Sequence, residues 1–174
     1  KTILEKKRMQ EYEIKKGDVF FLPAGRVHSI GAGSFIAEIQ QTSDITYRIY
    51  DFDRKDADGN PRELHTSLAA DAINYEVLDD YRTHYEVIEN EPVELVASPY
   101  FTTSVYEMSE EISCDYTELD SFIIFICVEG SCKMIDNQEN EVDLQAGETV
   151  LFPATTLDVR IVPNGNVKLL ETYI

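Results

Sequence analysis

The sequence predicts an all-β protein in which two series of short strands are separated by a short helical segment. First, β-branched and aromatic residues gather in short runs bounded by Gly, Pro, Asn and Asp, a pattern typical of strands joined by turns. Second, these runs fall into two groups, residues 11–52 and 92–173. Third, the unit Gly17-Asp-Val-Phe-Phe-Leu-Pro23 returns as Gly147-Glu-Thr-Val-Leu-Phe-Pro153, with the same glycine, apolar run and proline. Two related β-domains are therefore expected.

The first series predicts a partial β-barrel over residues 1–54. Its predicted strands are Glu11–Ile14, Val19–Leu22, Ser34–Gln41 and Thr46–Phe52. So short a series does not close a barrel, and an open sheet has unpaired edges that proteins normally cover or pair. We therefore expect this region to be the C-terminal half of a barrel, completed by residues before Lys1 or by another chain.

Residues 55–91 are predicted to be a linker made of a loop and one helix. Asp56-Ala-Asp-Gly-Asn-Pro61 is rich in turn-forming residues. Leu64, Leu68, Ala72 and Ile73 then recur at helical spacing, which predicts a helix from about Leu64 to Tyr75.

The second series begins at Pro92 and predicts a complete barrel over residues 92–174. Its predicted strands are Val93–Ser98, Thr102–Met108, Phe122–Val128, Cys132–Ile135, Glu141–Leu144, Thr149–Phe152, Leu157–Val162 and Val167–Tyr173. Short strands separated by turn signals such as Glu129-Gly130 and Ala146-Gly147 form a jelly roll, the architecture found in cupins. The predicted fold class is therefore all-β with a cupin-type jelly roll: a double-cupin remnant with a partial first barrel, a short helical linker and a complete second barrel.

Composition and charge narrow the choice of partners. The 174 residues are 43% hydrophobic, enough for a real core, and carry a formal net charge of −18. Such a charge repels nucleic-acid phosphates and anionic lipid, so neither a nucleic acid nor a membrane is expected as a partner. No apolar run approaches the roughly 20 residues of a spanning helix, and no signal-like segment opens the sequence. We expect a cytoplasmic protein.

One histidine stands where the first repeat can present it to a metal. The pattern Gly17-x5-Pro23-x-Gly25-x2-His28 ends a strand on a tight turn, which would aim His28 into the barrel. A neutral imidazole there can bind zinc or another divalent metal, although a lone histidine can equally be hydrogen-bonded in a core. The second repeat has Thr155 and Asp158 at the corresponding places, so its barrel is expected to hold no metal.

The residues that follow His28 resemble the signature of a known family. Glu38, Ser43, Asp44 and Arg48 come after a glycine turn at a spacing that resembles type I phosphomannose isomerases, which are mannose-6-phosphate isomerases. The similarity covers roughly residues 11–75. Tyr50-Asp-Phe-Asp-Arg54 and Arg62-Glu-Leu-His65 are similar to the short bacterial branch of this family.

The resemblance implies an enzyme that interconverts mannose 6-phosphate and fructose 6-phosphate at a zinc site. It implies that His28 is a zinc ligand and that Arg48 is catalytic, stabilising negative charge that develops on the sugar. The remaining zinc ligands are then expected before Lys1, so these residues alone should have little activity. Glu38 and Asp44 are candidate substrate-binding or orienting groups, or ordinary acids of a strand face, and Asp44 alternatively caps a turn.

Arg54 and Arg62 are candidate ligands of the substrate phosphate, because guanidinium groups match phosphate oxygens. Surface arginines in a loop are the alternative. His65 and His84 lack partners at metal-ligand spacing and are not expected to be ligands. The base that transfers the proton is not identifiable in the sequence.

Two other function classes remain open. A non-catalytic cupin-type module that binds a sugar is the alternative interpretation, and it predicts that His28 and Arg48 do not converge on one cavity. A cupin metalloenzyme with oxidative chemistry is disfavoured, because the pattern of two histidines and one carboxylate typical of iron oxygenases is not visible.

Overall fold

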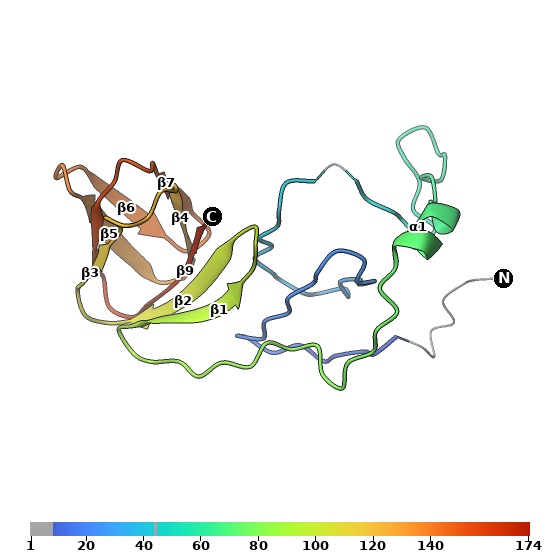
Figure 1. Cartoon of the computed structure of the whole chain (residues 1–174), viewed down its shortest axis with the longest axis horizontal. Helices are drawn as coiled ribbons and strands as arrows, with labels where there is room; N and C mark the ends of the chain where they lie inside the picture. The colour runs from blue at the N-terminus through green and yellow to red at the C-terminus, as the bar shows by residue number, and fades with distance from the viewer. Residues whose placement is uncertain (1–8, 44) are drawn as a thin grey trace. The chain divides into compact units, whose positions relative to one another are not determined.

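Two antiparallel sheets occupy most of residues 92–173 (Figure 1). The computed structural model describes residues 9–43 and 45–174. The chain divides into a first unit that ends at Arg82 and a second unit, Thr83–Ile174. The predicted boundary at residue 54 stays a prediction. In the described part of the chain, no helix has the length and apolar character needed to cross a bilayer.

The second unit is a two-sheet sandwich. Its strands are β1 (Pro92–Ala97), β2 (Thr102–Met108), β3 (Ile112–Asp115), β4 (Ile123–Glu129), β5 (Ser131–Asp136), β6 (Glu141–Gln145), β7 (Thr149–Phe152), β8 (Asp158–Pro163) and β9 (Val167–Tyr173). One sheet has the order β1-β2-β9-β4-β7 and the other β3-β8-β5-β6. The all-β jelly roll predicted from the sequence is confirmed, and β2, β7 and β9 have the predicted bounds.

The strand β3 is not among the predicted strands. It has only four residues, of which Ser113 and Asp115 are exposed, and Glu110-Glu111 precede it. Because so short a strand offers two apolar positions, its alternation is too brief to stand out from a polar loop.

Alternating side chains of both sheets form the core. Ile123, Phe125 and Cys127 of β4 are buried, and Met134 and Ile161 face them from the other sheet. Phe125 is fully buried, with its ring centroid 6.2 Å from that of Phe152. Burying a side chain of this size contributes about 1.5–3 kcal/mol, so this layer supplies much of the stability of the second unit.

The four strands predicted between Glu11 and Phe52 are wrong for the residues that the structure describes. This stretch is extended and carries no named strand. The expected turns do form, since Gly17 and Gly25 have φ values of 90° and 83°. A strand is stabilised by hydrogen bonds to a neighbouring strand, and within residues 9–43 and 45–82 no such ladder assembles.

Contacts between an arginine and aromatic rings stabilise part of the first unit, where hydrogen bonds between strands are missing among the described residues. The guanidinium of Arg82 lies 4.5 Å from the ring centroid of Tyr12 and 5.7 Å from that of Phe20. Its Nε is 3.3 Å from Oδ2 of Asp18. Cation–π contacts of this kind stabilise by about 0.5–1 kcal/mol at exposed sites.

The predicted linker helix is confirmed but shorter than expected. The helix α1 spans Thr66–Ala72 and ends because Ile73 takes an extended conformation. Gly25 lies against the end of this helix: its carbonyl accepts a hydrogen bond from the Asn74 N–H at 2.9 Å. A Cβ at Gly25 would lie 2.5 Å from the Ala72 carbonyl oxygen, so only glycine allows this approach. The turn before His28 is thereby fixed to the end of α1.

Candidate functional site

His28 lies in an exposed extended segment just past the turn at Pro23 and Gly25. The Arg26 N–H donates to the Pro23 carbonyl at 3.1 Å, which closes the turn. Nδ1 of His28 lies 3.0 Å from the carbonyl oxygen of Arg26. Because a carbonyl only accepts, Nδ1 carries the proton in this contact, and Nε2 keeps the lone pair that binds metals. His28 is exposed in the described residues, and its expected place inside a completed barrel stays a prediction.

Arg48 and His65 lie at the two ends of a loop, residues 48–65, and hydrogen bonds between them close it. The backbone N–H of Arg48 donates to Nδ1 of His65 at 3.2 Å, and the His65 N–H donates to the Arg48 carbonyl at 2.7 Å. An isolated bridge between Lys55 and Pro61 joins the two sides further along. His65 thus fixes the backbone at Arg48.

Asp51 is the buried centre of this loop. Its carboxylate is 7% exposed and accepts two hydrogen bonds from Arg62, at 2.7 and 2.5 Å, and one from Arg54 at 2.9 Å. Nε of Arg48 lies 3.8 Å from the same carboxylate. The hydrogen bonds from Arg62, with the charge of Arg54, hold the pKa of Asp51 at about 2. Asp51 is therefore ionised at any pH at which the protein works.

The structure brings Arg48, Arg54 and Arg62 together, and we call these three residues with Asp51 the arginine cluster. Because three guanidinium groups surround one carboxylate, the cluster has an excess of positive charge in a strongly acidic protein. The side chains of Arg54 and Arg62 are 63% and 45% exposed, so an anion can reach them. Guanidinium groups bind phosphate through paired hydrogen bonds.

The other predicted site residues are not part of this cluster. Glu38 is exposed, and among the described residues no ion pair joins it to the arginines. Asp44 lies outside the described residues. Asp51 was not predicted, although its spacing of three residues from both Arg48 and Arg54 is a signal that the sequence contains.

Metal-binding groups are sparse. Across residues 9–43 and 45–174, no three His, Cys, Asp or Glu side chains come close enough together to hold a metal ion. His28 can supply one ligand, and a zinc site of the catalytic kind needs three protein ligands and an open position.

The second unit contains a buried carboxylate that sequence reasoning missed. Side chains alternate along β9, so Glu171 lies on the same face as Val167 and Leu169 and points into the core, where an apolar residue is usual. Glu171 is 4% exposed and accepts a hydrogen bond from the phenol of Tyr116. Burial raises the pKa of Glu171 above its usual value, and that of the Tyr116 phenol rises for the same reason. The sequence signal for Glu171 is the alternation along β9, in which every second residue from Val167 to Glu171 is buried.

The two-sheet jelly roll and the repeated glycine–proline unit define the class of protein as a cupin. Residues 92–174 match the family model described as "Mannose-6-phosphate isomerase, cupin domain". The chain belongs to the mannose-6-phosphate isomerase family, which confirms the resemblance found in the sequence.

Relatives of known name support this assignment. The chain is 35% identical over 147 residues to mannose-6-phosphate isomerase ManA of Bacillus subtilis (strain 168), covering 83% of this chain and 46% of ManA. It is 32% identical over 143 residues to the mannose-6-phosphate isomerase of Streptococcus mutans, covering 82% of this chain and 44% of that protein. A crystal structure of the Bacillus subtilis isomerase matches 76% of this chain and 41% of its own chain, with 27% identity and a TM-score of 0.60. The chain therefore spans about half the length of the curated relatives it matches.

Proposed function

We propose that this chain is part of a zinc-dependent aldose–ketose isomerase that interconverts mannose 6-phosphate and fructose 6-phosphate. The observation that carries the proposal is the 35% identity to the Bacillus subtilis isomerase over 83% of the chain. The arginine cluster gives the proposal a chemical basis, because both the substrate phosphate and the reaction intermediate are anionic.

Arg48 stabilises the negative charge that develops during the reaction. The isomerisation opens the sugar ring and moves a proton between C1 and C2, and the enediolate formed between these steps is anionic. The Arg48 guanidinium is held by the Glu63 carbonyl at 3.3 Å and faces Asp51 at 3.8 Å, while its side chain stays 23% exposed. A cation fixed before the reaction stabilises the new charge without reorganisation.

Arg54 and Arg62 hold the substrate phosphate. Both guanidinium groups are accessible at one side and anchored by Asp51 at the other. Asp51 keeps them together against their mutual repulsion, and a phosphate dianion balances the remaining positive charge. Glu38 and Asp44 orient the sugar hydroxyls or the catalytic groups in this proposal.

Zinc would polarise the sugar oxygens as a Lewis acid. In this chain His28 would hold it through Nε2, since Nδ1 is engaged by the Arg26 carbonyl. One histidine does not fit zinc by itself, so the other ligands come from residues outside those described, and the 174 residues alone are expected to turn over little substrate.

The test is a coupled assay of mannose 6-phosphate conversion by the protein as its gene encodes it. Turnover that a chelator abolishes and zinc restores is the expected result. A protein that binds mannose 6-phosphate without turning it over, with or without zinc, would instead be a non-catalytic sugar-binding cupin. Substantial turnover by residues 1–174 alone would show that the metal ligands have been misassigned.

A further inference from the structure

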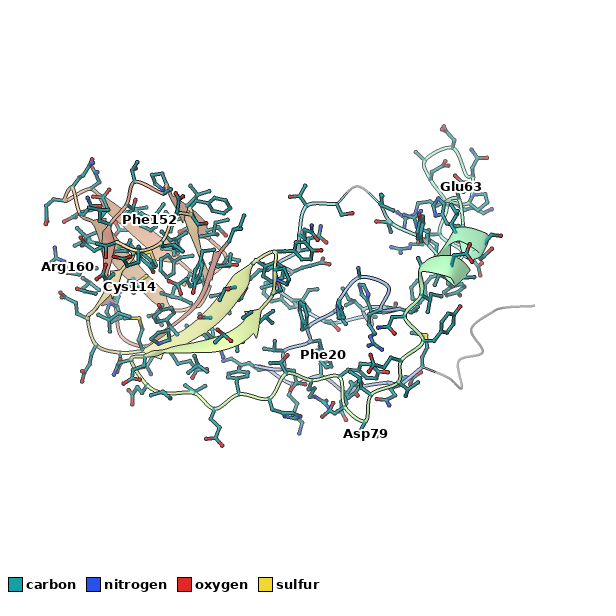
Figure 2. The ribbon with its side chains drawn as sticks, in the orientation of Figure 1. Phe20, Glu63, Asp79, Cys114, Phe152 and Arg160 are labelled. Atoms are coloured by element: carbon teal, nitrogen blue, oxygen red, sulfur yellow. The ribbon has the colours of Figure 1, made fainter. Side chains whose placement is uncertain are left out.

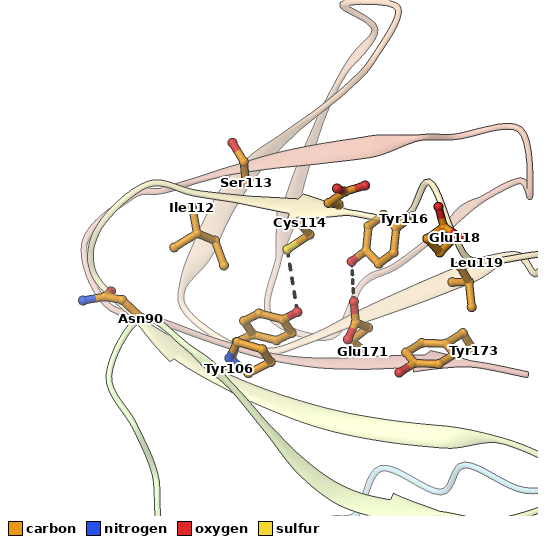
Figure 3. Close-up of a pocket in the computed structure, with 12 residues that line it drawn as sticks. Asn90, Tyr106, Ile112, Ser113, Cys114, Tyr116, Glu118, Leu119, Glu171 and Tyr173 are labelled. Atoms are coloured by element: carbon orange, nitrogen blue, oxygen red, sulfur yellow. Dashed lines mark hydrogen bonds between the residues drawn. The ribbon is translucent and has the colours of Figure 1, made fainter.

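A cavity of about 550 Å³ that is open to solvent lies in the second unit, far along the chain from the arginine cluster (Figure 3). Side chains from both sheets line it, with Tyr106 on β2, Cys114 on β3 and Glu171 on β9. Its volume is in the range of small-molecule sites. Nothing in the proposed isomerase reaction uses this cavity, since neither His28 nor Arg48 lines it.

The polar groups of the cavity gather around Glu171. Figure 3 shows the phenol of Tyr116 directed at the Glu171 carboxylate and the phenol of Tyr106 directed at Cys114. The Tyr106 oxygen lies 3.6 Å from the Cys114 sulfur. Tyr106 and Glu171 sit at core positions of β2 and β9, where an apolar side chain would pack at no cost in desolvation. Buried polar groups in a cavity are the pattern of a binding site, in which a few polar groups orient a ligand against apolar walls.

The charged residues that line the cavity are acidic, which favours a positively charged ligand. Asp115 and Glu118, both exposed, line the cavity together with Glu171. The Thr117 N–H donates to Asp115 at 2.9 Å, which lowers the pKa of that carboxyl and keeps it ionised. None of the residues that line the cavity in the described chain is Lys, Arg or His. A phosphorylated sugar or any other anion is therefore repelled.

The aromatic lining favours an organic cation over a metal ion. Three tyrosines, Tyr106, Tyr116 and Tyr173, contribute to the wall. The faces of aromatic rings attract ammonium groups, and aromatic side chains combined with carboxylates form the usual receptor for such ligands. A metal ion is disfavoured, because no three His, Cys, Asp or Glu side chains of the described residues are close enough to bind one.

We propose that the Glu171 cavity of the second unit binds a small organic ammonium ion, with the charge of Glu171 facing the nitrogen and the tyrosine rings enclosing its alkyl groups. This site is independent of the isomerase reaction. It gives the second unit a binding function in addition to supporting the fold.

Amide NMR spectra of the isotope-labelled 174-residue chain, titrated with choline chloride, test the proposal. The controls are sodium chloride at equal ionic strength, mannose, and the uncharged isostere in which carbon replaces the choline nitrogen. Saturable shifts at residues that line the cavity are expected with choline only. Binding of the isostere or of mannose as tight as that of choline would overturn the proposal, as would the absence of saturable shifts with choline.

Variants locate the site. Glu171→Gln keeps an acceptor for the Tyr116 phenol but removes the charge, and it should weaken choline binding by about tenfold or more. Glu118→Gln changes an exposed lining residue, so it cannot disturb the core, and it should weaken binding about twofold to fivefold. The matched control is Glu110→Gln, an exposed glutamate outside the lining, which should leave binding unchanged. Equal affinity of the Glu118→Gln and Glu110→Gln variants would overturn the proposal even if Glu171→Gln failed to fold.

Discussion

Two turn glycines of the second unit provide a matched test of the packing described above. Gly130 joins β4 to β5 and Gly147 joins β6 to β7, and both have positive φ, at 73° and 92°. An alanine in the left-handed region costs about 1–2 kcal/mol at either position. The two positions differ in the room available for a side chain. A Cβ at Gly130 would lie 2.2 Å from the Asn166 carbonyl oxygen, whereas a Cβ at Gly147 would meet nothing within 4 Å.

The expected difference follows from that contact. Real Cβ atoms essentially never approach another heavy atom within 3.0 Å, so Gly130→Ala must displace the backbone before β9. Forced shifts of this kind cost about 1–3 kcal/mol in addition to the φ cost. Gly130→Ala should therefore lower the free energy of unfolding by about 2–5 kcal/mol, and Gly147→Ala by about 1–2 kcal/mol.

Urea unfolding followed by far-ultraviolet circular dichroism measures both variants, since the strand signal of the described residues comes from the second unit. The midpoint should fall further for Gly130→Ala at an unchanged slope. Equal midpoints for the two variants would refute the close approach of Gly130 to Asn166.

Three further predictions concern the core, the arginine cluster and the metal. Phe125→Ala should lower the free energy of unfolding by about 3–5 kcal/mol in urea, because it empties a fully buried ring position, and a loss below about 1 kcal/mol would contradict the described core. The Asp51 carboxyl should titrate near pH 2 by NMR instead of at its usual pKa of 3.8. Because the pKa is lowered in the folded protein, the ionised carboxylate stabilises the loop fully above pH 3.8, and this stabilisation is lost as the pH falls through 2. Arg62→Gln should raise that midpoint, and an unchanged midpoint would mean that Arg62 is not the main partner. In the protein as its gene encodes it, His28→Ala should lower the zinc content measured by atomic absorption. The control His84→Ala, at another exposed histidine, should leave the zinc content unchanged. Equal zinc contents of the two variants would show that His28 is not a zinc ligand.

The strands of the second unit were predictable because their signals are local. Turn residues bound each run, and buried positions alternate with half-buried ones along most of β4 and along β9 as far as Glu171. The same alternation assigns Glu171 to the core face of β9, beside Leu169. Its partner Tyr116 lies 55 positions earlier, and no sequence rule gives that contact.

The first series shows the opposite case. Its residues have strand composition, yet a strand also needs a neighbour, and the neighbour is a non-local property of the fold. Phe35 and Tyr50, which belong to predicted strands, are 94% and 55% exposed, so these side chains are not covered by the described residues (Figure 2 draws the side chains).

The candidate site was predictable in part. The family pattern predicts Arg48 and the affinity of arginine for phosphate predicts Arg54 and Arg62, and the structure places all three around one carboxylate. Asp51 is not predictable in this way because its main partner, Arg62, lies 11 positions further along a loop whose ends are joined by Arg48 and His65. Loop closure of this kind is set by backbone geometry and not by spacing along the chain.

The central claim, that Arg48 serves a sugar-phosphate isomerase, is tested most directly by the kinetics of Arg48→Gln in the protein as its gene encodes it. Arg160→Gln, at a partly exposed arginine that pairs with Glu111 and Glu139, is the matched control. The account predicts that Arg48→Gln lowers kcat for mannose 6-phosphate by about 10²–10³-fold with little change in KM, while Arg160→Gln leaves both unchanged. Equal kcat values for the two variants would contradict it.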